Sequence, residues 1–268
     1  MPRPAFTYAL VTAASLALFL PLPAAASRLP QGERQGNASE APPVTASVEE
    51  LTARGDELRA EKRFAAALDY YETALAKTPD SASLHNRAGI VEMNLGEWKR
   101  SMREYKLAIK ADPTYSEAYN NLGVDYYELK QYKKAIALYR KAIRLRDQEA
   151  CYYSNLGAAY FSRKDFQKSA EAYTRALQLD PDVLDENART GVANLLPSPD
   201  DRARFDYAIA RLYAKMGASG HSLEHLRRAM EEGYKHIDDV YKDEDFANLR
   251  KDPRFVQLMT KRPAALPE

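Results

Sequence analysis

The chain has 268 residues, with 39 lysines and arginines against 38 aspartates and glutamates, so its formal net charge is +1. This balance gives no electrostatic footprint for nucleic acid, which proteins bind with an excess of positive charge. The single cysteine, Cys151, excludes an intramolecular disulfide and any site built from several thiolates. Hydrophobic residues make up 45% and charged residues 29%, proportions that suit a folded chain rather than a disordered one.

Residues 1–26 predict a secretory signal peptide. Arg3 precedes an apolar stretch over residues 5–20, and three alanines at 24–26 stand where a signal peptidase reads small residues. We therefore expect an exported protein, periplasmic or extracellular, with no stable membrane insertion after cleavage. The alternative is an uncleaved anchor, although the apolar stretch is short for a membrane span. Residues 27–47 are rich in Pro, Gly, Gln, Ser and Ala and predict a disordered linker.

A regular period, of about 34 residues, organises the middle of the chain. A glycine, an aromatic residue, a small residue, a tyrosine and an alanine each recur at this spacing. In that order, they are Gly55, Gly89, Gly123 and Gly157; Phe64, Trp98, Tyr132 and Phe166; Ala67, Ser101, Ala135 and Ser169; Tyr71, Tyr105, Tyr139 and Tyr173; and Ala74, Ala108, Ala142 and Ala176. Four repeats result, over residues 48–81, 82–115, 116–149 and 150–183.

Each repeat is expected to form two helices, because its apolar residues recur every three or four positions and polar clusters divide it in two. Helices of about 14 residues would be roughly 20 Å long. Pro79, Pro113 and Pro181 are expected to end second helices, since proline removes a donor and clashes with the preceding turn; Asp147 stands at this place in the third repeat. One pair cannot bury its apolar stripe alone, so stacked pairs predict an all-α, right-handed solenoid.

These columns resemble the tetratricopeptide repeat (TPR) family, most clearly at YNNLG (residues 119–123) and YSNLG (residues 153–157). The resemblance covers residues 48–183 and implies a protein-interaction module without enzymatic activity or cofactors. The first repeat departs from the family pattern at Arg54, where leucine is usual. The second departs from it at His85, where an aromatic residue is usual.

The second half of the chain breaks the period. Residues 184–201 predict a connecting helix and a proline-rich loop, LLPSP, in which Pro197 ends the helix. Residues 202–236 predict a TPR-like hairpin with helices over 202–216 and 222–232. In an alternative frame, residues 204–215 form the second helix of a fifth repeat. Residues 237–262 predict capping helices, over 245–250 and 252–259, that would cover the apolar face of the last repeat.

A zinc-dependent hydrolase is the competing hypothesis. His221, Glu224 and His225 match H-x-x-E-H, and histidines at i and i+4 share a helix face. In the alternative interpretation the helix belongs to the hairpin and both histidines lie on its outer surface. Cys151 has no histidine in its own repeat to activate it, so we interpret it as a tolerated residue on the inner side. We expect no metal site and no cofactor.

The resemblance implies that the first helices line a concave groove, which would suit an extended or helical peptide. Its predicted binding residues are Asn86, Ile90, Met93, Asn120, Asn121, Val124, Tyr127, Ser154, Asn155 and Phe161. Alternatively, the apolar members of this set pack helix against helix. Family members that clamp a terminal carboxylate use cations, and the corresponding positions here hold none, which argues against such a clamp.

The sequence therefore predicts an exported, non-enzymatic TPR scaffold that binds a protein or peptide, in the role of a cell-envelope assembly or adaptor factor. A chaperone-like holdase with many clients is the alternative within the same fold.

Overall fold

The computed structural model describes residues 41–184 and 198–265, and within them all regular structure is helical. The predicted all-α fold of helical hairpins is confirmed. The predicted signal peptide, residues 27–40 of the predicted linker and residues 185–197 of the predicted connecting segment lie outside the described residues. None of the described helices combines the length and the apolar content needed to cross a bilayer.

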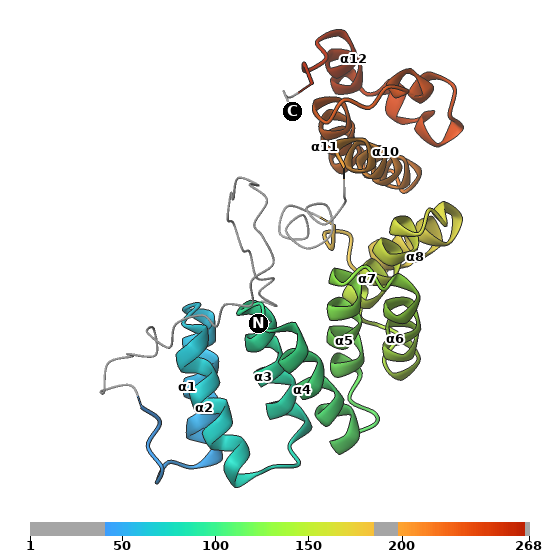
Figure 1. Ribbon diagram of the computed structural model, residues 1–268. Helices are drawn as coiled ribbons and strands as arrows, with labels where there is room; N and C mark the ends of the chain where they lie inside the picture. The colour runs from blue at the N-terminus through green and yellow to red at the C-terminus, as the bar shows by residue number, and fades with distance from the viewer. Residues whose placement is uncertain (1–40, 185–197, 266–268) are drawn as a thin grey trace, which may run out of the picture. The chain divides into compact units, whose positions relative to one another are not determined.

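Eight helices form the four repeats (Figure 1). They are α1 (Val48–Ala60), α2 (Phe64–Lys77), α3 (Ala82–Asn94), α4 (Trp98–Ala111), α5 (Ser116–Glu128), α6 (Tyr132–Leu145), α7 (Ala150–Ser162) and α8 (Phe166–Leu179). The C-terminal part contains α10 (Pro199–Lys215), α11 (Ser219–Glu231), three short 3-10 turns and α12 (Pro253–Thr260). The 3-10 turns are η2 (Ile237–Tyr241), η3 (Glu244–Phe246) and η4 (Leu249–Lys251).

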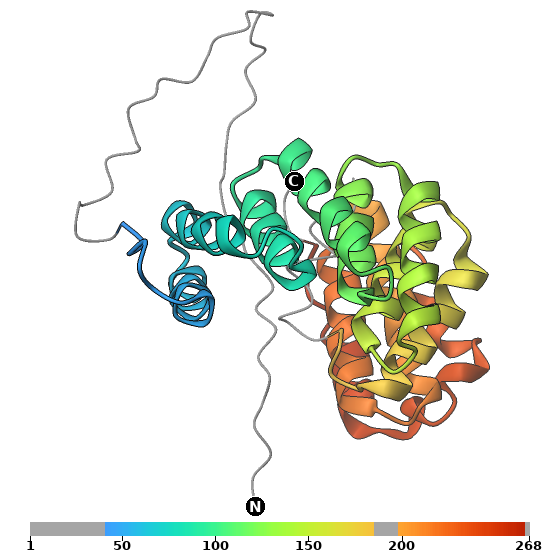
Figure 2. The same cartoon turned by 90° about the horizontal axis from the view of Figure 1, so that it is seen from below.

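The described residues group into two compact units that divide within α5, after Asp125. In unit 1, which ends at Asp125, α1 packs on α2 and α3 on α4, and α2 packs in turn on α3 (Figures 1 and 2). In unit 2, which begins at Tyr126, α6 packs on α7 and α7 on α8. Successive helical pairs therefore stack within each unit.

The helices begin and end where the local sequence favours it. Ser47 forms a capping box with Glu50: its hydroxyl accepts from the Glu50 amide at 3.1 Å, and its own amide donates to the Glu50 carboxylate at 2.8 Å. α2, α4 and α8 each end two residues before a proline, as predicted. α6 ends at the same place in its repeat with Asp147 instead, so proline is not required there.

The predicted linker is too long at its C-terminal end. The Ala46 amide donates to the Pro43 carbonyl at 3.0 Å, and Lys77 donates to the Ala46 carbonyl. Ala46 and Val48 also pack on the apolar core of the first repeat, which contains Leu51. Pro43 and Ala46, inside the predicted linker, therefore belong to the folded part.

In three of the repeats, a tyrosine ring on the second helix packs directly against a glycine on the first helix. A methyl group on Gly89 would lie 2.6 Å from Tyr105 Cε1, and one on Gly55 would lie 2.5 Å from Tyr71 Cε1. In the fourth repeat, a methyl group on Gly157 would lie 3.0 Å from the ring of Tyr173. The tyrosine rings occupy the space of the missing side chains, so the two helices approach closely.

The C-terminal hairpin of α10 and α11 shares one internal hydrogen bond with the helical pair of the fourth repeat. In the fourth repeat the Ser169 hydroxyl donates to the Gly157 carbonyl, twelve residues earlier, at 3.0 Å. In the hairpin the Ser222 hydroxyl donates to the Ala210 carbonyl, again twelve residues earlier, at 2.7 Å. This bond favours the frame in which α10 takes the place of a first helix over the frame in which it is the second helix of a fifth repeat. α10 begins at Pro199, capped by Ser198, three residues before the predicted start.

A second shared feature is a buried pair between a histidine and a carboxylate nineteen residues apart. His85 Nδ1 lies 2.7 Å from Glu104 Oε2 in the second repeat, and His225 Nδ1 lies 2.8 Å from Asp206 Oδ1 in the hairpin. The histidine comes from the first helix in one pair and from the second helix in the other. This pairing explains why His85 replaces the usual aromatic residue.

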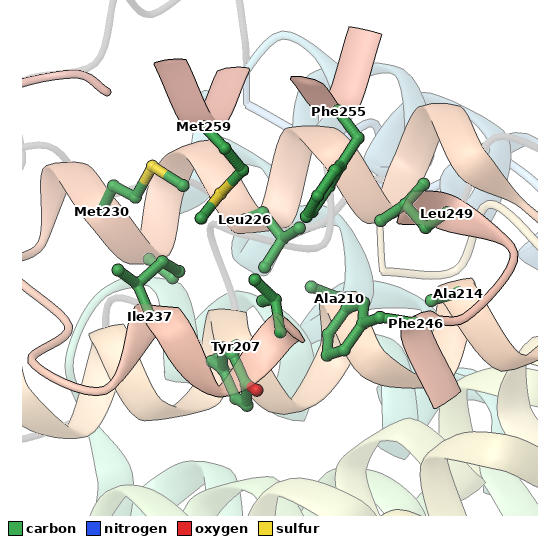
Figure 3. Close-up of a cluster of buried hydrophobic side chains, with 12 residues drawn as sticks. Tyr207, Ala210, Ala214, Leu226, Met230, Ile237, Phe246, Leu249, Phe255 and Met259 are labelled. Atoms are coloured by element: carbon green, nitrogen blue, oxygen red, sulfur yellow. The ribbon is translucent and has the colours of Figure 1, made fainter. Parts of the chain in front are cut away.

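The C-terminal elements enclose one apolar cluster (Figure 3). Its buried members are Tyr207, Ala210, Ala214, Leu226, Ala229, Met230, Ile237, Val240, Phe246, Leu249, Phe255 and Met259. Residues 245–250 do not form the predicted helix: two 3-10 turns place Phe246 and Leu249 in the cluster instead. α12 forms as expected, with Asp252 as its cap and Pro253 in its first turn.

One charged residue is buried in the second repeat. Glu92 is 2% exposed, and its Oε1 lies 2.9 Å from Arg100 Nε. The corresponding positions in the next two repeats hold cation–π pairs, with Lys134 5.1 Å from the Tyr126 ring centre and Lys168 5.7 Å from that of Tyr160. Glu92 Oε2 has no hydrogen-bond partner among the described residues. Burial raises the pKa of Glu92 to about 7, although Arg100 favours its charged form.

The tyrosine column predicts opposite effects for one substitution at two places. Tyr173 is buried, and its hydroxyl makes no hydrogen bond within the described residues, so Tyr173→Phe should leave stability unchanged or raise it by up to about 1 kcal/mol. The Tyr71 hydroxyl donates to Asp56 Oδ1 at 2.7 Å, so Tyr71→Phe should cost about 1–2 kcal/mol. Urea denaturation of the two variants checks this, and equal losses would contradict it.

Glu92 predicts a pH dependence of stability. In the unfolded chain the pKa of Glu92 is near its ordinary value of 4.5, whereas in the folded protein it is about 7. Between these two pH values the folded protein therefore holds a proton that the unfolded chain has lost. Stability should therefore fall as the pH rises from about 4.5 to about 7, and Glu92→Gln should remove this fall. Melting temperatures across that range measure it. Glu97→Gln, which changes another partner of Arg100, is the control and should keep the wild-type slope.

Candidate functional site

The predicted groove residues of unit 1 come from α3 and α5. Asn86, Ile90 and Met93 follow the i, i+4, i+7 spacing of one face of α3. Ile90 and Met93 are partly exposed, whereas Asn86 is 6% exposed. On α5, Asn120 is 8% exposed, while Asn121 and Val124 are partly exposed. This face therefore presents three partly exposed apolar side chains beside three amides, of which only Asn121 is partly exposed. We refer to these six residues as the unit 1 face.

The amides form a hydrogen-bonded chain between the two helices. Asn120 Nδ2 donates to Asn121 Oδ1 at 3.2 Å, and Asn121 Nδ2 donates to Asn86 Oδ1 at 2.9 Å. The second bond links α5 to α3, two helices that are distant in sequence. These bonds fix the orientations of the side-chain amides and so pre-organise the polar part of the surface.

A charged cluster on α1 and α3 was missed by the sequence analysis. Asp56 accepts from Tyr71 at 2.7 Å, from Arg87 Nε at 3.1 and 3.2 Å, and from Arg59 at 3.4 Å. The carboxylate and both guanidinium groups are about one third exposed. One acid thus holds two arginines at the surface of unit 1. Asp56 and Arg59 lie on α1 and Arg87 lies on α3, so helical spacing within one repeat gives no signal for their contact.

The predicted groove residues of unit 2 lie mainly in the packing between helices. Tyr127 is 6% exposed and its hydroxyl lies 2.8 Å from Ser162 Oγ; burial raises its pKa to about 12. Phe161, also 6% exposed, makes edge-on contacts with Phe166 and Phe205.

The polar members of this set in unit 2 differ in burial. Ser154 is 5% exposed, and Asn155 is partly exposed. The burial of Tyr127 and Phe161 agrees with the alternative that the apolar stripe packs helix against helix.

The H-x-x-E-H residues do not converge. His225 is 2% exposed and pairs with Asp206, so the expectation that it lies on the outer surface is wrong. His221 stacks on the Tyr213 ring, with centres 4.8 Å apart, and Glu224 pairs with Arg227 at 2.6 Å. Within the described residues no group of three or more His, Cys, Asp or Glu side chains could hold a metal ion.

Cys151, the one cysteine, is exposed near the start of α7. The residues of its own repeat include no histidine. Its own repeat therefore offers no histidine that could activate the thiol, and we keep the interpretation of Cys151 as a tolerated residue.

Two family models, both described as tetratricopeptide repeat, match residues 52–116 and 117–182. None of the curated proteins compared with the chain matches it in sequence.

Solved structures share the fold at low sequence identity. PilF of Pseudomonas aeruginosa is 18% identical with a TM-score of 0.54, over 80% of this chain and 96% of that one. A thermophilic TPR protein of Thermus thermophilus is 20% identical with a TM-score of 0.50, over 80% of this chain and 100% of that one. MamA (residues 41 to the end) of Desulfovibrio magneticus RS-1 is 18% identical with a TM-score of 0.50, over 72% and 99%.

The two adjoining matches cover the same repeats as the glycine and tyrosine columns, and the structure folds those repeats as stacked helical pairs. Over residues 52–182, the chain belongs to the tetratricopeptide repeat family.

Proposed function

We propose that the chain is a non-enzymatic scaffold that binds a polypeptide segment of a partner along the unit 1 face. The observation that carries this proposal is the amide chain Asn120–Asn121–Asn86 beside the half-exposed Ile90, Met93 and Val124. TPR repeats support protein interaction as the general role.

The chemistry of the face suits a peptide. A side-chain amide both donates and accepts, so the partly exposed Asn121 can bind a backbone N–H or C=O group of a bound segment, while Asn86 and Asn120 hold it in place. Ile90, Met93 and Val124 offer apolar contacts, and methionine adapts readily to different side chains because its stem is flexible. The arginines at Asp56 would favour an acidic residue in the partner, since two guanidinium groups share one carboxylate there.

The setting of this scaffold is proposed from the sequence. The apolar stretch before the three alanines at 24–26 favours export to the periplasm or beyond. A repeat protein in that compartment fits the role of an assembly or adaptor factor of the cell envelope. The same face would serve a holdase, which differs in binding many unfolded clients rather than one partner.

A zinc hydrolase is the weaker candidate. Its activity would require His221, Glu224 and His225 to share one metal, whereas His225 faces Asp206 and Glu224 faces Arg227. The geometry therefore favours a binding function.

Blocking the unit 1 face should abolish partner capture without unfolding the protein. Met93→Arg with Val124→Arg places two large charged side chains at half-exposed positions, and we expect at least a tenfold loss of the captured partner, equal to about 1.4 kcal/mol or more. The measurement is affinity capture from the cell-envelope extract of the source organism, quantified by mass spectrometry. Met102→Arg on α4, at another half-exposed methionine of unit 1, is the matched control.

Retention of every wild-type partner by the double variant would contradict the assignment of the face. Loss of one or a few proteins supports a dedicated scaffold, while loss of a large and diverse set supports the holdase. Melting temperatures of all three proteins confirm that they are folded. Tyr127 and Phe161 are unsuitable for this test because their substitution would disturb packing inside unit 2.

A further inference from the structure

The tips of the third and fourth hairpins carry a concentration of positive charge. We define the turn edge of unit 2 as residues 128–134, which join α5 to α6, together with residues 162–168, which join α7 to α8. Its exposed cations are Lys130, Lys133, Lys134, Arg163, Lys164 and Lys168. Neither stretch belongs to the unit 1 face, and neither takes part in the proposed peptide site.

The two tips lie side by side. The Tyr127 hydroxyl, just before the first tip, is 2.8 Å from the Ser162 hydroxyl in the second. Tyr132, at the other end of the first tip, has its ring centre 5.3 Å from that of Tyr127. The cations of the two turns therefore belong to one surface.

The acids of this surface do little to offset its charge. Glu128 is partly buried, and burial raises its pKa, which favours its neutral form. Asp165 pairs with Lys168 at 2.6 Å. After Glu128 no acid occurs until Asp147, and seven lysines and arginines lie between them. The basic surface thus continues along α6.

Apolar side chains protrude among these cations. Leu129 is 43% exposed beside Lys130, and Phe166 is 49% exposed between Lys164 and Lys168. Both stand on hairpin tips. In unit 1 the equivalent tip carries Leu95, which is 40% exposed, but Glu97 lies beside it. The combination of excess positive charge with exposed apolar residues is therefore found on the tips of unit 2.

Two of the lysines hold a backbone conformation that favours glycine. Lys130 has φ of 57° and Lys164 has φ of 62°, whereas Gly96 and Gly217, at the same place in their hairpins, have φ of 75° and 79°. A residue with a Cβ is strained in this region, and glycine is not. Glycine would therefore be the more stable choice at both positions, and it would remove the charge.

We propose that the turn edge of unit 2 binds the surface of an anionic phospholipid bilayer. Lysines and arginines are attracted to anionic headgroups, and protruding leucine and phenylalanine side chains can enter the boundary between headgroups and acyl chains. An acidic peptide is usually bound in a groove. Protruding side chains suit a bilayer instead, because lipid headgroups can move apart to admit them. The binding is peripheral and places the peptide-binding scaffold at a membrane.

The test compares glycine substitutions that change charge and backbone in the same way. The full chain and its variants are sedimented with vesicles of phosphatidylcholine, with or without a third of phosphatidylglycerol. Residues 1–26, with their one charged side chain, Arg3, are the same in every variant, so their contribution cancels when variants are compared. A difference between variants in the increase caused by phosphatidylglycerol therefore reports the basic surface.

Lys130→Gly with Lys164→Gly should lower this increase about 25-fold, or roughly fivefold for each cation. Lys62→Gly is the matched control, because Lys62 has φ of 60° on the tip of the first repeat beside Glu61, and it should leave the increase unchanged. Leu129→Ser should lower vesicle binding several-fold, while Leu95→Ser should not. The double glycine variant should melt no lower than the wild type, so a loss of binding cannot come from unfolding.

Several results would overturn the proposal. They are the absence of any increase with phosphatidylglycerol, an equal loss in the Lys62→Gly control, and wild-type binding by the double variant. Binding to soluble polyglutamate without binding to either vesicle would also overturn it and would assign the turn edge to an acidic polypeptide.

Discussion

In the first, second and fourth repeats, a tyrosine ring on the second helix occupies the space that a side chain on the first helix would need. The glycines Gly55, Gly89 and Gly157 leave this space, and the rings fill it to within 2.5, 2.6 and 3.0 Å of where a Cβ would lie. The rest of the repeat follows from this contact. It sets the close approach of the two helices, and it explains why a tyrosine and a glycine recur with the same period. Much of the tyrosine content thus serves packing rather than recognition.

The periodic part of the fold could be predicted because the same glycine and tyrosine positions recur once in each of the four repeats. Each of the four predicted repeats contains a helix of 13 residues followed by one of 14, close to the predicted length. Contacts that occur once could not be predicted. The buried pair of His225 and Asp206 joins two helices, and the sequence gives no sign that these two side chains come into contact. Similarly, a helical pattern does not distinguish a helix from the 3-10 turns around Phe246, where burial in the apolar cluster decides the conformation.

The candidate site also combines features that helical spacing predicts with contacts that it does not predict. Helical spacing placed Asn86, Ile90 and Met93 on one face of α3, and the structure adds the amide bond from Asn121. Spacing alone could not show that Tyr127 and Phe161 are buried between helices. A residue on the inward face of a helix is buried or exposed according to the side chains of the neighbouring helices. The two proposed surfaces use different parts of the hairpins. The peptide site lies along first helices, and the lipid site lies at the tips that join first helices to second ones.

The packing of tyrosine on glycine is tested most directly by comparing alanine at two helical glycines. Gly89→Ala places a methyl group 2.6 Å from the Tyr105 ring, so we predict a loss of about 1–3 kcal/mol in the free energy of unfolding. Gly220 on α11 has no atom within 4 Å of such a methyl group, so Gly220→Ala should instead gain about 0.5–1 kcal/mol from its higher helix propensity. Urea denaturation followed by circular dichroism measures both values. A Gly89→Ala variant as stable as the wild type would contradict the account.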